Sequence, residues 1–474
     1  MEKSKKGRAL VTVLIITFMV TLDSSIVNVA LPEMAKNLGV DMGGIEWVAT
    51  GYLLVVSATV MLFGKLGDMY GKARIFQIGV VIFTVGSLLC SLSGTLLWLI
   101  IFRAFQGLGG AAALANNQGI ITETFSLTER GRALSSMSAA VALGLMSGPV
   151  IGGVIVSMLS WPFIFLINVP VGTIAFLLGL KNLPYRTVHV KEKLDAKGSL
   201  FMIVSIVFIF SAIPLLNKNQ NFWTIGMLLL GILLFIFFIL EERQAENPLI
   251  QLGVFKNKLF SINLFGSFIS FVVIGALNII LPFYLQDVMN LSPEMTGLML
   301  TVTPLVIAVV GPISGVLTDR FGYRHLLPIS FGWYAFAILL ALILNTDTPL
   351  WLIAGLLGLG GIGNAAVQPP GNTLLMSGVS NENLGFAGSL AGLMRNIGIT
   401  TGVMLGTSLL YNRMSAMIGY PVFGYVPGRN DVFVVGMHWV YGTLGALLIL
   451  VTGLFCYVLL IGDKKKKFIE NQEG

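Results

Sequence analysis

Long apolar stretches with almost no charge recur along the chain, separated by short segments that hold most of the charged residues. A helix that spans a membrane needs about 20 mostly apolar residues. By this criterion the pattern predicts fourteen transmembrane helices. Their ranges are 10–32, 46–64, 75–94, 96–122, 132–156, 162–182, 198–216, 222–240, 259–285, 295–317, 326–345, 349–377, 384–412 and 434–462. The first stretch is too long for a cleavable signal and lacks a small-residue cleavage site, so we expect it to remain as a helix.

The composition agrees with this pattern. Hydrophobic types make up 55% of the 474 residues and charged types 11%, with a mean hydropathy of +0.88. Soluble domains contain about a quarter charged residues, so a soluble fold is excluded. The 55 glycines suit close helix packing in lipid. The fold class indicated is an all-α integral membrane protein. The two cysteines, Cys90 and Cys456, lie in apolar stretches and are expected to be buried free thiols.

The basic residues predict the topology. With the N-terminus placed inside, inner segments hold 23 of the 29 Lys and Arg residues and outer segments hold four. The other two, Arg103 and Arg395, lie within predicted helices. Lys and Arg accumulate in cytoplasmic loops, so both termini are expected in the cytoplasm. The same distribution explains the net charge of +7 without nucleic-acid binding.

Four sequence patterns recur in the same order, at offsets of 250 to 254 residues. Their ranges are 28–32 with 278–282, 64–71 with 315–322, 107–110 with 358–361, and 144–152 with 398–406. The offset spans eight predicted helices, an even number, so the two copies insert in parallel. We therefore expect an N-terminal six-helix half (1–182), a two-helix insert with inner linkers (183–258), and a C-terminal six-helix half with a basic tail (259–474). Transporters built from repeats bind substrate at the repeat interface.

Three charged residues lie deep within predicted helices: Asp23, Arg103 and Arg395. Charges inside a membrane are costly and are functional candidates. Asp23 and Arg103 lie at similar depths and could meet across the N-terminal half. Their repeat counterparts, Val273 and Ala354, are apolar, so the duplicated scaffold does not itself demand the charges. We expect Asp23 to carry a coupling proton. The alternatives are a static ion pair or an Asp23 exposed to a water-filled vestibule.

Several other residues are candidates for the transport machinery. Glu123 ends the fourth predicted helix and is a second-choice proton carrier, although a solvated terminus explains it as well. Gly148 and Pro149 fit a hinge or seal between the halves, or tight packing alone.

The Asp68 and Asp319 loops, with Arg74 nearby, fit a latch at an inner gate, or simply an anchor of the topology.

The candidates for a substrate cavity are polar residues within the predicted helices, which can orient a ligand or bond across helices. They are Asn28, Asn116, Asn117, Gln118, Asn364, Gln368 and Arg395. The three histidines have no partners at metal-ligand spacing, so no metal site is proposed. No phosphate-binding loop or hydrolase motif occurs, so neither an ATP-driven pump nor an enzyme is expected.

At these motifs the sequence resembles the major facilitator superfamily, in its 14-helix drug:proton antiporter branch. Leu22-Asp23-Ser-Ser-Ile-Val-Asn28-Val-Ala-Leu-Pro32 looks like the helix-1 motif of that branch. Residues 64–74 match the loop 2–3 signature. Arg103-Ala-Phe-Gln106-Gly107-Leu-Gly109 looks like the helix-4 motif, and residues 144–153 match the helix-5 antiporter motif.

The resemblance implies alternating access by a rocker switch, with efflux driven by inward proton flow. It assigns coupling to Asp23 and Arg103, gating to Asp68, and the antiport seal to Gly148 with Pro149. It further implies a bacterial cytoplasmic membrane, a monomer, and the proton as coupling ion without any cofactor. Dication exporters of this branch often carry further acidic residues in the C-terminal half. Here Arg395 lies in that half instead, so monocations, neutral lipophiles or anions fit better.

The sequence therefore favours a proton-coupled exporter of amphipathic drugs or toxic compounds, with a role in antibiotic resistance. A dedicated exporter of a single metabolite or lipid on the same fold is the alternative. A non-transporting membrane sensor is disfavoured, because the longest predicted inner loops are too short to form an output domain.

Overall fold

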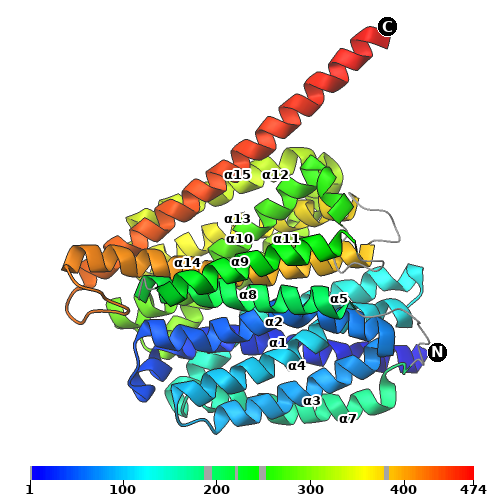
Figure 1. Cartoon of the computed structure of the whole chain (residues 1–474). Coiled ribbons are helices and arrows are strands. Elements are labelled where there is room, and N and C mark those ends of the chain that lie inside the picture. Colours follow the sequence, from blue (N-terminus) through cyan, green and yellow to red (C-terminus); the bar gives the residue numbers. More distant parts are fainter. Residues whose placement is uncertain (1–2, 186–194, 219–221, 245–251, 378–383, 474) are drawn as a thin grey trace.

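The computed structural model describes the chain apart from residues 1–2, 186–194, 219–221, 245–251, 378–383 and 474. Helices are the only regular secondary structure in the described part, which contains no strand (Figure 1). Its α-helices are α1 (Lys3–Leu38), α2 (Met42–Tyr70), α3 (Lys72–Ser91), α4 (Leu96–Thr124), α5 (Leu127–Met158), α6 (Phe163–Leu166), α7 (Asn168–Asn182), α8 (Ala196–Lys218), α9 (Phe222–Glu242), α10 (Lys258–Phe283), α11 (Pro293–Phe321), α12 (Tyr323–Leu340), α13 (Leu350–Ser377), α14 (Leu384–Ile418) and α15 (Asn430–Glu473). Short helical turns are η1 (Leu252–Lys256), η2 (Tyr284–Val288) and η3 (Ala341–Ile343).

The predicted all-α membrane fold is confirmed. Thirteen stretches of the described helices are long and apolar enough to cross a membrane, and α14 occupies the place of the remaining predicted span. The sixth span is interrupted at Ile167, between α6 and α7, and the ninth ends in the π-helical turn η2. Most helices are longer than the predicted spans, because their polar ends continue past the apolar stretch.

Local sequence explains where the repeated helices begin and end. The Asp41 side chain accepts a hydrogen bond from Gly44 N at 2.6 Å and caps α2, and Ser292 caps α11 in the same way. Gly71 and Gly322 end α2 and α11 with φ of 100° and 76°, a backbone region that glycine adopts without strain. The two copies of the sequence repeat therefore make the same turn.

Packing follows the repeat as well. Helices α1 to α7 pack together, and α10 to α15 pack together, with α1 against α5 and α10 against α14 in corresponding positions. In Figure 1 the first group runs from blue through cyan to blue-green, and the second runs from green through yellow to red. The hairpin α8–α9 lies beside both groups, and α8 contacts α2 and α14. The helix α15 projects well beyond the bundle at its C-terminal end (Figure 1).

Glycines allow the helices to approach closely inside each half. A Cβ atom on Gly148 would overlap the Ser25 hydroxyl of α1, and one on Gly152 would lie 2.8 Å from Ile26 Cγ1. In the second half, a Cβ atom on Gly402 would overlap the backbone of α10. Small residues permit such approach where lipid supplies no hydrophobic driving force between helices.

Direct contacts between the halves gather at one end of the bundle. We call the end where α1 begins the N-terminal end, and the opposite end, where α1 joins α2, the distal end. At the distal end Gly297 of α11 lies against the Pro149 carbonyl of α5. Gly43 N donates to Phe423 O at 2.9 Å, and Gln286 Nε2 of η2 donates to Val29 O of α1 at 3.0 Å. The described contacts therefore close the distal end.

Candidate functional site

The Asp23 carboxylate is fully buried and lies at the centre of a polar network inside the N-terminal half. Arg103 Nη1 donates to Asp23 Oδ2 at 2.7 Å. Gln106 Nε2 and Asn168 Nδ2 both donate to Asp23 Oδ1, at 3.0 and 2.7 Å. Helices α1, α4 and α7 thus converge on one carboxylate, and each of its oxygens is engaged.

The Arg103 guanidinium is fixed on several sides. Its Nε donates to Val48 O of α2 at 3.0 Å, and its Nη1 also donates to Gln106 Oε1 at 2.5 Å. The Tyr52 ring lies 4.2 Å from its Cζ atom, a distance suited to a cation–π contact. Arginine fits this position because a planar fork of donors serves several acceptors at once.

Two residues of this network had no predicted role in the sequence analysis. Gln106 lies three residues after Arg103, on the same face of α4, and its Nε2 also donates to Ser87 Oγ of α3 at 2.7 Å. Asn168 begins α7 directly after the interruption at Ile167. The available signal was an isolated amide within an apolar span, but spacing alone does not reveal its partner.

Asp23 and Arg103 form a buried ion pair in which each charge compensates the other. Removing one partner of a buried ion pair costs about 3–5 kcal/mol, because the other charge is left without compensation. Protonation of Asp23 would cancel one of the two charges and leave Arg103 without its counter-charge. Asp23 and Arg103 are 0% and 1% exposed, so neither meets solvent in this conformation.

The corresponding region of the C-terminal half is neutral. Val273 is fully buried, and the nearby polar contacts join uncharged groups. Asn364 Nδ2 donates to Ser270 Oγ at 3.3 Å, and Asn263 Nδ2 donates to Gly371 O at 2.8 Å. The paired scaffold therefore holds a charged network in one half and an uncharged one in the other.

The acidic residues at the N-terminal end form surface ion pairs. Lys72 Nζ contacts Asp68 Oδ1 at 2.7 Å and Glu123 Oε1 at 2.9 Å, joining α2, α3 and α4 within one half. Arg74 and Asp319 are both exposed. No ion pair between the halves occurs at this end among the described residues. The latch role of Asp68, Arg74 and Asp319 and the proton role of Glu123 stay predictions.

The candidate cavity residues divide into two groups. Asn116 Nδ2 donates to Phe63 O of α2 at 3.1 Å, Asn117 Nδ2 donates to Thr17 Oγ1 of α1 at 3.3 Å, and Asn364 contacts α10 as described. These three side chains join helices. The second group makes no side-chain hydrogen bond with other described residues and stays available for a ligand. It comprises the half-buried Asn28, Gln368 and Arg395 and the exposed Gln118.

A further buried acid, Glu46, lies at the distal end and was not recognised as a candidate. It is 3% exposed and projects from the first turns of α2 toward Thr407 of α14. It is the first residue of a predicted span, and the sequence analysis assigned it no role. Only the packing of α14 against α2 places it in an interior.

Comparison with known proteins identifies the family. The Major Facilitator Superfamily profile matches residues 13–254 and 264–474. The chain is 37% identical over 418 residues to the riboflavin transporter RibZ of Clostridioides difficile, covering 86% of this chain and 90% of that protein. It is 32% identical over 396 residues to multidrug resistance protein 3 of Bacillus subtilis, covering 82% and 76%. The chain belongs to the major facilitator superfamily.

Solved structures show the same fold at low identity. A crystal structure of the peptide transporter POT in complex with sulfate matches with a TM-score of 0.67 and 18% identity, covering 94% of this chain and 95% of that chain. A bacterial homologue of the lysosomal transporter Spinster matches with a TM-score of 0.66 and 16% identity, covering 97% and 98%. Membership of the family and its transporter relatives, together with the apolar helices, show that this major facilitator protein is a multi-pass membrane transporter of a small molecule.

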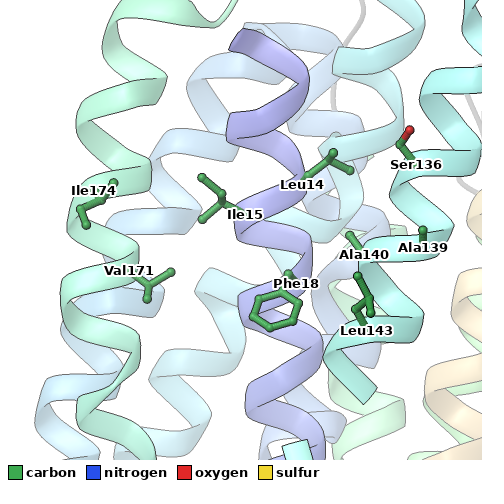
Figure 2. A pocket seen from close by; sticks show the side chains of 9 residues that line it. All are labelled: Leu14, Ile15, Phe18, Ser136, Ala139, Ala140, Leu143, Val171 and Ile174. Atoms are coloured by element: carbon green, nitrogen blue, oxygen red, sulfur yellow. The ribbon is translucent and has the colours of Figure 1, made fainter. Parts of the chain in front are cut away.

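A shallow groove of about 630 Å³ lies on the flank of this transporter, away from the Asp23 network. Figure 2 shows its side chains, contributed by α1, α5 and α7. Leu143 and Ile174 are more than half exposed, and Ser136 is the one polar side chain in the lining. Such a surface suits lipid acyl chains and lacks the polar groups that would orient a polar ligand.

No group of three or more His, Cys, Asp or Glu side chains in the described ranges could hold a metal ion. Cys90 is buried near Gln106, its Sγ 3.9 Å from Oε1, and Cys456 is exposed. The expectation that both thiols are buried is therefore wrong for Cys456, which is exposed on α15.

Proposed function

We propose that this transporter exports amphipathic drugs or toxic compounds from the cytoplasm in exchange for protons. The observation that carries the proposal is the Asp23–Arg103 ion pair, fully buried in one half and absent from the repeated position of the other. A pair that the fold does not require, kept at the cost of desolvating two charges, is best explained by a function. The similarity to multidrug resistance protein 3 supports drugs as the substrate class.

The basic loops indicate which end of the helix bundle faces the cytoplasm. With Lys and Arg residues on the cytoplasmic side, both termini are cytoplasmic and the distal end faces outward. The contact between Gly297 and Pro149 then closes the outer side, and the conformation described is inward-facing. The rocker switch would separate this contact and join the N-terminal ends of the halves in the other state.

The network suggests how a proton drives this switch. A proton that enters from outside binds Asp23 and cancels its charge, so the 2.7 Å contact loses its attraction to Arg103. Arg103 keeps its bonds to Val48 O and Gln106. The contacts that α1 and α7 make through Asp23 weaken, which loosens α1 against α4. Release of the proton inside restores the ion pair and completes the exchange.

The cavity residues indicate which compounds fit. Arg395 is half-buried and has no ion-pair partner among the described residues, and Asn28 and Gln368 offer neutral amides. This set favours neutral, monocationic or anionic aromatic compounds over dications.

A dedicated metabolite exporter is the second candidate. The 37% identity to a riboflavin transporter favours a flavin or a similar planar heterocycle, which amides can orient by hydrogen bonds.

The test is substrate transport in proteoliposomes under an imposed pH gradient. The panel would contain one cationic, one neutral and one anionic lipophile together with riboflavin, with wild type beside Asp23→Asn. We expect gradient-driven transport of several lipophiles, lost in Asp23→Asn. Transport of riboflavin alone would favour the dedicated exporter. Undiminished gradient-driven transport by Asp23→Asn would contradict the proton role of this residue.

A further inference from the structure

Glu46 occupies an unusual position for a carboxyl group. It lies in α2 at the distal end, where α2 meets α14 of the other half. Its side chain is 3% exposed, and its Oε2 atom has no hydrogen-bond partner among the described residues. The Thr407 hydroxyl of α14 faces the carboxyl group, and this hydroxyl already donates to Val403 O at 3.0 Å.

The groups around Glu46 supply no positive charge. The titratable groups that face it are Asp41, at the start of α2, and Tyr411 of α14. The Tyr411 hydroxyl is buried and lacks a hydrogen-bond partner, as does the Thr50 hydroxyl one turn along α2. No Lys, Arg or His within the described ranges forms an ion pair with Glu46.

This environment suits a neutral carboxyl group. An ionised carboxylate buried without a cation or strong donors is costly, and the nearby negative charge of Asp41 adds to that cost. A protonated carboxyl group has one O–H donor, which the Thr407 or Tyr411 oxygen can accept across the interface. Protonation thus turns an isolated charge into a link between the two halves.

We propose that Glu46 is a second proton-binding site of this protein, occupied while the distal end is closed and emptied when α2 and α14 separate. The site rests on the alternating access proposed above but not on the compound carried. It is distinct from the Asp23 network, because it lies between the halves whereas Asp23 is enclosed within one. Glu46 binds a proton when the distal end closes. When the distal end opens, water reaches the carboxyl group and the proton is released.

Linkage then fixes the direction of the pH effect. When opening releases one proton, the ratio of open to closed distal ends rises with pH, by at most about tenfold per pH unit. Acid closes the distal end, and alkali opens it. If the distal end faces outward, an acidic exterior favours the conformation described here.

The experiment is electron-spin distance measurement in lipid nanodiscs. Spin labels would be placed on Asn37→Cys and Met417→Cys, two exposed distal positions on opposite halves, after Cys90→Ala and Cys456→Ser. We expect a separated population that grows as the pH rises. Glu46→Gln mimics the protonated side chain and should remain closed at every pH. Asp41→Asn keeps the helix cap but removes the negative charge beside Glu46, so its pH response should persist with the midpoint moved to lower pH.

Two further measurements keep the test decisive. The same titration in Asp23→Asn separates the two sites, and the Glu46-dependent shift should survive there. Infrared spectra of the unlabelled protein should show a protonated-carboxyl band that is missing in Glu46→Gln, with helix content checked by circular dichroism. Two results would overturn the proposal: a distance between the labels that does not change with pH, or a pH response of Glu46→Gln equal to that of its parent. Failure of substrate efflux alone counts against the proposed function and leaves this distance measurement unaffected.

Discussion

Gly297 of α11 lies directly against the carbonyl oxygen of Pro149 in α5, so closely that a Cβ atom on Gly297 would overlap it. The same stretch of α5 uses Gly148 to approach α1 within its own half. One face of α5 thus packs inside the half while its neighbouring face meets the other half. Because both partners at this crossing are backbone atoms, neither can yield without a helix shift.

Gly297→Ala should therefore weaken closure of the distal end. Overlap in a packed interface costs about 1–3 kcal/mol, enough to shift the open-to-closed ratio by about fivefold to a hundredfold. The distance between labels on residues 37 and 417 measures this shift. Gly311→Ala is the matched control on the same helix, since nothing lies within 4 Å of its Cβ position. An equal response of the two variants would show that Gly297 does not limit closure.

We expect substitutions at Asp23 and Arg103 to have non-additive effects on the free energy of unfolding. Asp23→Asn and Arg103→Gln should each lower the free energy of unfolding by about 3–5 kcal/mol, since each leaves a buried charge alone. The double variant should recover much of this loss, because no uncompensated charge remains. Thermal unfolding in detergent measures the cycle, and proton-driven transport should stay absent in all three variants. Additive losses would mean that the two charges do not stabilise each other.

We expect replacement of Asn168 to change the pH dependence of transport. Asn168→Leu removes the 2.7 Å hydrogen bond to Asp23 Oδ1. The ionised carboxylate loses a donor, so the protonated form gains relative weight. The pH profile of gradient-driven transport should therefore move upward. Asn117→Ala, which removes an amide bonded to Thr17 instead, should leave the profile in place. An unmoved profile in Asn168→Leu would separate Asn168 from proton binding.

At the N-terminal end, Lys6 Nζ donates to Glu129 Oε2 at 2.7 Å and lowers the pKa of this exposed carboxyl. A lowered pKa in the folded state stabilises the protein above the ordinary carboxyl pKa, and this stability is lost as the pH falls through the lowered value. Lys6→Gln should therefore lower the melting temperature slightly at neutral pH and have no effect in acid. High salt should reduce the difference. A destabilisation that persists in acid and in high salt would point to packing instead.

Much of the fold could be predicted from the sequence, and part of the site. The lengths of the apolar stretches located the helices. The positions of Asp23 and Arg103 along their helices predicted that both lie at a similar depth in the membrane. Gln106 and Asn168 were missed because an amide in an apolar span has many equally plausible partners. Asn116 and Asn117 also show that the sequence does not reveal the partner of an amide. They are adjacent on α4, yet Asn116 contacts α2 and Asn117 contacts α1.

The sequence by itself determined the helices, the internal repeat and the three charges within apolar spans. Lipid selects apolar length residue by residue, and both a repeat and a charge are visible in the letters of the sequence. The tertiary structure decided which polar groups meet. Asn168 reaches Asp23 from α7, and Glu46 becomes interior when α14 packs over it. Both contacts depend on how helices far apart in the chain are rotated and crossed against each other. Packing between helices sets these angles, and a local pattern of residues does not specify them.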